Sequence, residues 1–330
     1  MKILLSLLVG LGIAMLLTPQ GGIESTGFPQ KPVTLIVPYS PGGAVDTIGR
    51  TVAKYIEQYL GQRVIVRNKP GAGGEIGYRS LSSSNPDGYT MGMITAPPIL
   101  MLQMIRESSA SDISGFEVLA SIQKDPVVLA VAADSPFKTL IELLEAARNV
   151  EAGVINVAGD GPLSNNQLQL VVAESKFNVD FNFVPFSGSG PSISALVGGQ
   201  VHAAVPSASS VTNFVNRGDV RALAVFSPER YEFLPQVPTV FEATGVEVPD
   251  IGAAVRGIVV PVGLPVRSKQ LLIDTIEKLM VDAEFIAHAR KVGIPLHYMS
   301  ASDFTQYLVT LESQLGVYMP LLSDKLEQAN

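Results

Sequence analysis

The feature that most constrains this fold is a repeated order of apolar strand, glycine-containing loop and amphipathic helix. The first copy spans 33–61, where VTLIVP is followed by YSPGG and then by a helical pattern. An unbroken apolar run of this length is typical of a strand buried on both faces of a parallel sheet. Apolar residues then recur at steps of three and four from Val45 to Leu60, and Gly61 follows where helices commonly end. Repetition of this unit predicts an α/β fold.

Two series of such units are predicted along the chain. In the first, the strands 33–38, 63–68 and 89–94 alternate with helices and form the start of a doubly wound sheet. The second series adds strands at 127–133, 154–159, 181–186, 201–206 and 220–226. We therefore expect a second α/β unit with its own sheet.

The C-terminal part has a different pattern, with one strand at 253–261 followed by three mainly helical stretches. These are too few strands for a third domain, so we expect this part to return and cover the first sheet. The predicted first domain comprises 28–125 plus 246–330, and the second comprises 126–245. Two chain crossings would then form a hinge, with a ligand cleft between two doubly wound sheets.

Composition excludes several classes of function. The 330 residues carry a net charge of −7 with no run of Lys or Arg, which argues against nucleic acid and against an anionic membrane surface. The chain has no cysteine, so thiol catalysis, Cys-ligated metal and disulfides are excluded. Neither a Walker P-loop, a zinc-binding HExxH nor a GxSxG nucleophile elbow is present. We expect a protein that is not an enzyme and has no cofactor or metal.

The N-terminal residues resemble a secretory signal. Lys2 precedes an apolar run at 3–17, which is shorter than the roughly 20 residues of a membrane span. We expect a signal peptide over 1–24, although its cleavage site is poorly marked, and an uncleaved anchor remains an alternative. The mature protein is expected to be exported.

Four loops share the design of a ligand-binding strand end. Each places glycine, serine or proline between a strand and a helix, at 40–46, 70–77, 159–165 and 186–192. In open α/β sheets, ligands bind beyond the carboxyl ends of strands, where helix N-termini present free N–H groups to anions. No Lys or Arg lies in these loops, so a carboxylate suits them better than a triphosphate. Ordinary turns are the alternative for each loop.

Individual residues near these loops have more than one interpretation. Asp46 is a candidate ligand contact, but it could equally cap or support the first turn of its helix. Tyr39 and Phe186 flank glycine loops and could stack on a ligand, and core packing is the alternative for both.

Several segments resemble the Bug-type, or TctC-like, solute-binding receptors of tripartite tricarboxylate transporters. They are KPVTLIVPYSPGGAVDTIGR, NKPGAGGEIGYRSLSSSNPDGYTM, VPFSGSGPSISALVGGQVHAAV, VRALAVFSPERYEFLPQVPTVFEATG and RGIVVPVGLP, in family order from about residue 28 to the C-terminal helices. The resemblance implies a two-domain periplasmic-binding-protein fold of type II-like form.

The resemblance also implies a function and partners. Such receptors capture a small carboxylate in the periplasm and deliver it to the small and large subunits of an inner-membrane transporter. Dicarboxylates, tricarboxylates, acidic amino acids and aromatic acids all fit, and we expect a monomer. A receptor of the same fold that signals to a membrane sensor kinase is the alternative.

The resemblance assigns candidate ligand contacts to both sides of the cleft. Departures from the family pattern are Ser187 where Lys is frequent, Phe186 for Tyr, Leu264 for Thr, and no His after Ser164. These departures leave the ligand's identity open, because polar groups of the cleft set specificity. Together with Tyr39, the candidates are Ser40, Pro41, Gly42, Gly43, Asp46, Ala72, Gly73, Gly74, Thr95, Ser164, Asn165, Ser187, Gly188, Ser189, Gly190 and Ser207.

Overall fold

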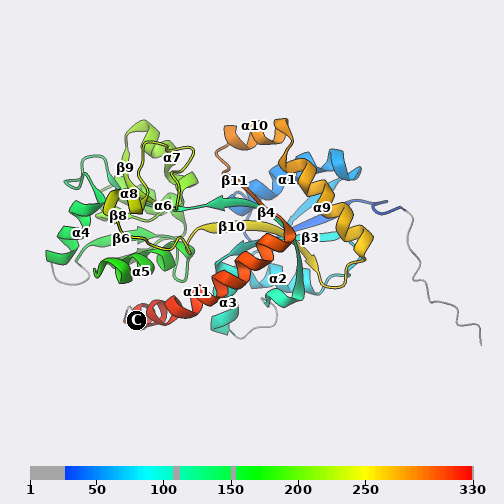
Figure 1. The fold of residues 1–330 in the computed structure, drawn as a ribbon, viewed down its shortest axis with the longest axis horizontal. Coiled ribbons are helices and arrows are strands. Elements are labelled where there is room, and N and C mark those ends of the chain that lie inside the picture. The colour runs from blue at the N-terminus through cyan, green and yellow to red at the C-terminus, as the bar shows by residue number, and fades with distance from the viewer. Residues whose placement is uncertain (1–26, 107–111, 150–153, 329–330) are drawn as a thin grey trace, which may run out of the picture.

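The structure is a computed structural model that describes residues 27–106, 112–149 and 154–328. It has two lobes, each built on its own mixed β-sheet and lying side by side along the long axis (Figure 1). The predicted signal peptide at 1–24 lies outside the described residues. Within the described ranges, no helix is both long enough and apolar enough to cross a membrane.

The first lobe contains a six-stranded sheet in the order β11-β4-β10-β3-β1-β2. Its three N-terminal strands are parallel, whereas β10 is antiparallel to both of its neighbours, β3 and β4. The strands are β1 (Val33–Val37), β2 (Val64–Asn68), β3 (Thr90–Ala96), β4 (Phe116–Asp125), β10 (Ala254–Pro261) and β11 (Leu296–Met299).

Helices cover both faces of the first sheet, and their apolar sides pack against the strands to form one hydrophobic core on each face. On α1, the side chains of Ile48, Val52 and Ile56 are fully buried, in a cluster that also includes residues of α9 and α10. The opposite face carries α2, α3 and part of α11. The helices are α1 (Ala44–Leu60), α2 (Glu75–Ser82), α3 (Pro98–Arg106), α9 (Val266–Met280), α10 (Ala283–Lys291) and α11 (Ala301–Gln328), with short 3-10 turns at η1 (Ala72–Gly74) and η2 (Ile113–Gly115).

The second lobe contains a five-stranded sheet in the order β7-β6-β8-β5-β9. Strands β7, β6 and β8 are parallel, and β5 is antiparallel to β8 and β9. Its strands are β5 (Val127–Ala132), β6 (Asn156–Gly159), β7 (Asn182–Pro185), β8 (Ala203–Ala204) and β9 (Val220–Phe226). Its helices are α4 (Leu140–Asn149), α5 (Asn165–Phe177), α6 (Ser189–Val197), α7 (Ala208–Arg217) and α8 (Val240–Thr244).

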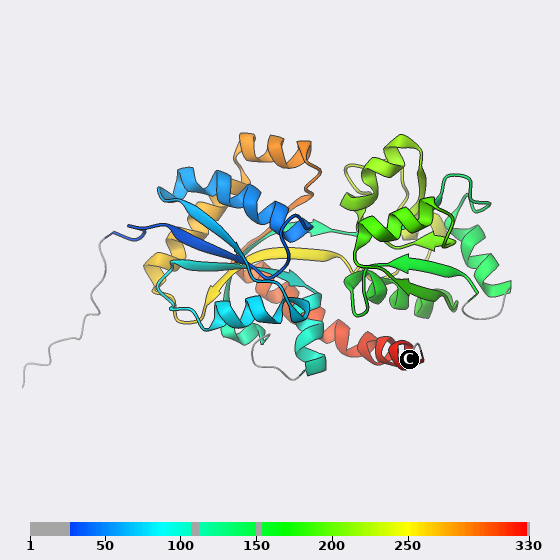
Figure 2. The same ribbon diagram turned by 180° about the vertical axis from the view of Figure 1, so that it is seen from behind.

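Three connections join the lobes. Strand β4 continues almost directly into β5, and the chain returns through 245–253 to β10. The third connection is helix α11, which runs from the first lobe to pack against α5 (Figures 1 and 2). Near its end, Lys325 forms ion pairs with Glu174 of α5 and with Asp180. The described structure therefore adds a packed helix to the two crossings that the sequence suggested.

The α/β class with two sheets is confirmed, but both sheets are mixed rather than purely parallel. The sequence patterns predict no element between 95 and 126, a stretch that contains α3 and β4. They also miss β11, and they give six residues to β8, which has two. Strand β4 is buried along most of its length between two neighbouring strands. Its sequence therefore does not alternate between apolar and polar residues, and no period of two marks it as a strand. The domain boundaries 28–125, 246–330 and 126–245 remain a prediction.

Candidate functional site

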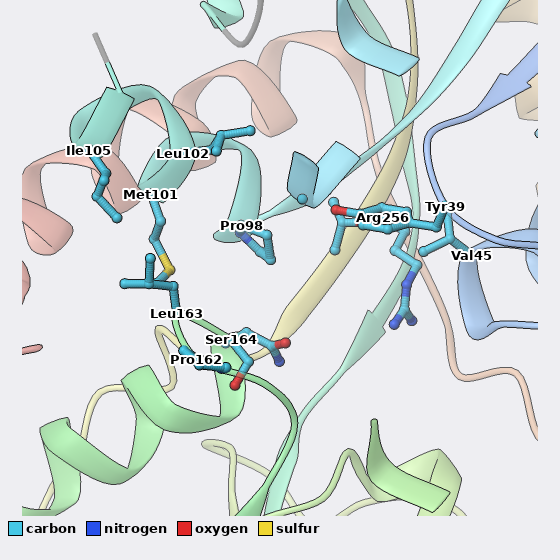
Figure 3. Close-up of a pocket in the computed structure, with 13 residues that line it drawn as sticks. Tyr39, Val45, Pro98, Met101, Leu102, Ile105, Pro162, Leu163, Ser164 and Arg256 are labelled. Carbon is cyan, nitrogen blue, oxygen red and sulfur yellow. The ribbon is translucent and has the colours of Figure 1, made fainter. Parts of the chain in front are cut away.

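A cavity of about 440 Å³ lies where the two lobes meet (Figure 3). From the first lobe, it is lined by the ends of β1 and β3, by η1, by helix α3 and by one side chain of β10. From the second lobe, it is lined by the turn that leads into α5. The lining residues are Tyr39, Val45, Gly73, Thr95, Pro98, Met101, Leu102, Ile105, Pro162, Leu163, Ser164, Asn165 and Arg256.

Sheet topology explains why the first lobe presents polar groups here. Strands β1 and β3 are parallel neighbours, so their carboxyl ends meet at the same edge of the sheet. Tyr39 follows β1 by two residues, and Thr95 is the penultimate residue of β3. Strand β10 pairs with β3 in a register that sets Arg256 opposite Thr95. Three segments far apart in the sequence therefore bring a hydroxyl, a phenol and a guanidinium to one wall.

Arg256 is the most unusual polar group of this wall. Its side chain is only 7% exposed, and its Nε and Nη1 atoms are buried without a hydrogen-bond partner. Its Nη1 atom lies 3.7 Å from Oδ2 of Asp125, which is an ion pair too long for a hydrogen bond. Buried polar groups are nearly always hydrogen-bonded, so these unpaired donors make Arg256 the group of this wall that lacks a full set of partners.

Two carboxylates, Asp125 and Asp160, interact electrostatically with the Arg256 guanidinium. Asp125 is fully buried at the end of β4, and it accepts hydrogen bonds from the backbone N and the Oγ of Ser209, at 3.1 and 2.6 Å. Asp160 accepts a hydrogen bond from Ser189 Oγ at 2.9 Å. Burial raises the pKa of Asp160, while its hydrogen bond from Ser189 and the charge of Arg256 oppose that rise.

Tyr39 and Thr95 add uncharged polar groups. The phenol oxygens of Tyr39 and Tyr78 lie 3.2 Å apart, and burial raises the pKa of both above the ordinary tyrosine value. Both phenols are therefore protonated at neutral pH. The Thr95 Oγ1 atom is buried beside the Tyr39 phenol. This wall can thus offer a ligand a cation and hydroxyl groups, without a competing negative charge in the lining itself.

Asp46 supports the first glycine loop. Its Oδ2 accepts hydrogen bonds from Gly42 N and Arg50 Nε, both at 2.9 Å, and its Oδ1 accepts one from Asn68 Nδ2 at 2.8 Å. Gly42 has a φ of 82°, a left-handed conformation that favours glycine. Burial acts to raise the pKa of Asp46, but the hydrogen bonds from Arg50, Gly42 and Asn68 outweigh it and lower the pKa. The Asp46 carboxylate therefore stabilises the conformation of the loop at 40–43.

The second-lobe wall is the N-terminal turn of α5. Ser164 is the N-cap, and its Oγ accepts a hydrogen bond from Gln167 N at 3.2 Å. Asn165 Nδ2 donates to the Gly252 carbonyl of the returning crossing at 2.8 Å. A Cβ at Gly252 would lie 2.6 Å from the Asn165 carbonyl oxygen, so only glycine allows this approach. The helix start that faces the cavity is thereby fixed to the segment that leads to β10.

The structure brings some of the predicted contacts together and leaves others apart. Tyr39, Gly73, Thr95, Ser164 and Asn165 line the cavity. Ser40 to Gly43 form the adjoining loop into α1, Asp46 lies in the first turn of α1, and Ala72 and Gly74 flank Gly73 in η1. Ser187 to Gly190 lie at the start of α6, and Ser207 is the N-cap residue of α7, with neither group in the lining. Ligand contact by any of these residues remains a prediction.

Sequence reasoning missed Arg256 and the α3 wall. Arg256 lies outside the four glycine-containing loops, inside the strand AAVRGIVVP. A lone arginine inside an apolar strand is itself a signal, because charged residues are almost never fully buried unless paired. Helix α3 has an apolar sequence, PILMLQMI, that follows β3 after Pro97 and was not assigned to any element.

The family follows from a comparison that covers most of the chain. A family model described as the tripartite tricarboxylate transporter family receptor matches residues 48–316. This chain belongs to that receptor family. A relative in Pseudomonas sp. strain P51, a UPF0065 protein in the tcbD-tcbE intergenic region, is 32% identical over 289 residues, covering 87% of this chain and 85% of the relative.

Solved structures of receptors of this type share the fold. A TctC solute-binding protein from Polaromonas is 29% identical with a TM-score of 0.76, covering 90% of this chain and all of that protein. MatC from Rhodopseudomonas palustris with bound malate is 25% identical with a TM-score of 0.73, covering 89% and 100%. The family and these neighbours are solute-binding proteins and not enzymes. The resemblance found in the sequence is therefore confirmed at the level of family and fold.

Proposed function

We propose that this receptor captures a small carboxylate in the cavity between its lobes and delivers it to a tripartite tricarboxylate transporter in the inner membrane. The observation that carries the proposal is Arg256, a buried arginine that lines the cavity with two unpaired donor nitrogens. In this proposal the ligand carboxylate binds the guanidinium, and Thr95 and Tyr39 supply hydroxyl contacts.

The energies support an anion of modest size. A hydrogen bond to a charged group contributes about 1.5–3 kcal/mol, and arginine can form two such bonds with one carboxylate. Micromolar affinity corresponds to about 8 kcal/mol of net binding free energy. A paired contact at Arg256, a hydroxyl contact and free N–H groups at the start of α5 together reach that range after ordering costs.

The family supports the location and the partners that we propose. The predicted signal peptide at 1–24 would direct export, and the family is defined as receptors of a transporter, so we place the mature chain in the periplasm. MatC, the relative with bound malate, supports a carboxylate as the ligand class. The small and large membrane subunits are the proposed recipients.

The test is thermal unfolding of the exported protein with a panel of small carboxylates and their amides. A ligand at 100 times its dissociation constant stabilises a protein by about 2.7 kcal/mol. We expect stabilisation by at least one acid and none by its amide. In Arg256→Lys the affinity should fall by about tenfold or more, because lysine cannot form the paired contact.

Arg221→Lys is the matched control, since Arg221 is a partly buried arginine of β9 that donates to the carbonyl oxygens of Ala133 and Phe137, outside the cavity lining. It should leave affinity unchanged. Equal stabilisation by acid and amide, or unchanged affinity in Arg256→Lys, would show that Arg256 does not bind a carboxylate.

A further inference from the structure

The cavity has two chemically different ends. Arg256 and Tyr39 lie together on one side, and Met101, Leu102 and Ile105 of α3 lie on the other with Leu163 (Figure 3). Pro98, at the start of α3, lies between the two groups in the same view. A ligand that fills the cavity would therefore meet a cation at one end and mainly hydrocarbon and thioether groups at the other, with Ser164 of the α5 turn beside them.

The apolar end includes exposed hydrophobic surface. Met101 is almost fully buried, Leu102 is half-buried, and Ile105 is 43% exposed. Ile105 lies four residues after Met101 and three after Leu102 along α3, so its side chain is next to both of them on the helix surface. Exposed apolar surface beside a concave site is typical of ligand contact.

Leu163 completes this end from the second lobe. Its φ of 58° is in the left-handed region, which is uncommon for a residue other than glycine, asparagine or aspartate. Its backbone N donates a hydrogen bond to Gln167 Oε1 at 2.8 Å, which helps hold the turn. Unfavourable backbone conformations concentrate at ligand-binding sites, where the surrounding structure enforces them. Here the conformation accompanies a leucine side chain that faces α3.

The charge balance limits the ligand to one carboxylate. Among the described residues, Arg256 is the single charged side chain in the cavity lining. Its charge is already shared with Asp125 at 3.7 Å and with Asp160 nearby. A second ligand carboxylate at the α3 end would meet no cationic side chain, and the start of α5 beside Leu163 would offer it uncharged N–H and hydroxyl groups alone, so an apolar group is favoured there.

We infer that the ligand is a monocarboxylate with an apolar chain or ring, bound with its carboxylate at Arg256 and its apolar body against α3 and Leu163. This inference rests on the proposed function, because it specifies the ligand class of the same cavity. It excludes malate-like and citrate-like acids as the preferred ligands.

Calorimetric titration with butanoate, hexanoate and octanoate, compared with malate and citrate, tests this inference. Affinity should rise about fourfold for each added methylene group that becomes buried. Hexanoate should bind at least about tenfold more tightly than malate or citrate, since only the dicarboxylate and tricarboxylate place charge at the apolar end.

Two variants locate the apolar contact. Leu102→Asn and Ile105→Asn should flatten the dependence on chain length while leaving the affinity for butanoate nearly unchanged. Ile141→Asn is the matched control, because Ile141 on α4 is 47% exposed and lies outside the cavity lining. It should retain the full chain-length dependence.

The outcomes separate the two proposals. Tighter binding of malate or citrate, with no dependence on chain length, would overturn the monocarboxylate inference and leave the carboxylate receptor standing. Full chain-length dependence in both α3 variants would overturn the placement against α3. Failure of every acid to bind would overturn the proposed function itself.

Discussion

The two walls of the cavity are built in different ways. The first-lobe wall takes its polar groups from two paired strands and from the segment that follows β1, with Arg256 opposite Thr95 in the register of β10 and β3. The second-lobe wall is a single helix start, capped by Ser164 and fixed to the returning crossing through Asn165. Strand pairing fixes side chains precisely relative to one another, whereas a helix start offers backbone N–H groups that suit many anions. We therefore assign ligand discrimination to the first wall and general anion affinity to the second.

The largest effect is expected at Asp125, which compensates the charge of the first wall. Asp125→Asn should destabilise the protein by about 3 kcal/mol, because it leaves a buried guanidinium with a weaker partner. Chemical denaturation measures this change. Asp219→Asn is the control, since Asp219 pairs with Arg217 on the surface, where removal of an ion pair changes stability by less than about 1 kcal/mol. Equal effects of the two substitutions would contradict the role given to Asp125.

Asp46 should show an intermediate effect with a distinct pH dependence. Asp46→Asn should cost about 2 kcal/mol at pH 7, because the carboxylate accepts three hydrogen bonds, one of them from Arg50. The folded pKa is lowered, so this stabilisation is present above the ordinary aspartate value of about 3.9 and is lost as the pH falls through the folded pKa.

Denaturation of wild type and Asp46→Asn at pH 7 and near pH 3 tests this sign. The stability difference between the two proteins should shrink in acid. A difference that stays constant, or that grows as the pH falls, would mean that Asp46 does not hold the loop as a carboxylate.

The smallest effect is expected at the second wall. Ser164→Ala should reduce stability by about 1 kcal/mol through loss of the cap, and we expect the affinity for a carboxylate to change by less than threefold. Thr239→Ala removes a capping box from α8, outside the cavity, and serves as the matched control for stability. A loss of affinity in Ser164→Ala as large as that in Arg256→Lys would remove the proposed difference between the walls.

Sequence patterns predicted the elements that make local contacts. Strand β9 was predicted with its observed bounds, and α1 ends at Gly61 in the expected left-handed conformation. These features depend on residues that are close together in the sequence, so hydrophobic periodicity and helix-capping residues predict them directly. The supporting role weighed for Asp46 is also local, because it bonds Gly42 and Arg50 at a spacing of four residues on either side.

The candidate site could be predicted only in part, because its central group depends on long-range pairing. Arg256 reaches the cavity only because β10 lies between β3 and β4, and its counter-charge Asp125 ends β4, which no sequence pattern predicts. Tyr39 packs against the first core and also lines the cavity, so core packing is observed and contact with a ligand stays a prediction. A pattern within one segment of the sequence does not show which strands pair or in which register, so it could not place Arg256 at the cavity.

The most direct measurement is a crystal structure of the exported protein with the tightest-binding acid from the panel. We expect both carboxylate oxygens within about 3 Å of guanidinium nitrogens of Arg256, with the remainder of the ligand against α3. A carboxylate bound instead at the loops 40–46 or 186–192, with Arg256 out of contact, would contradict the assignment of ligand discrimination to the first wall.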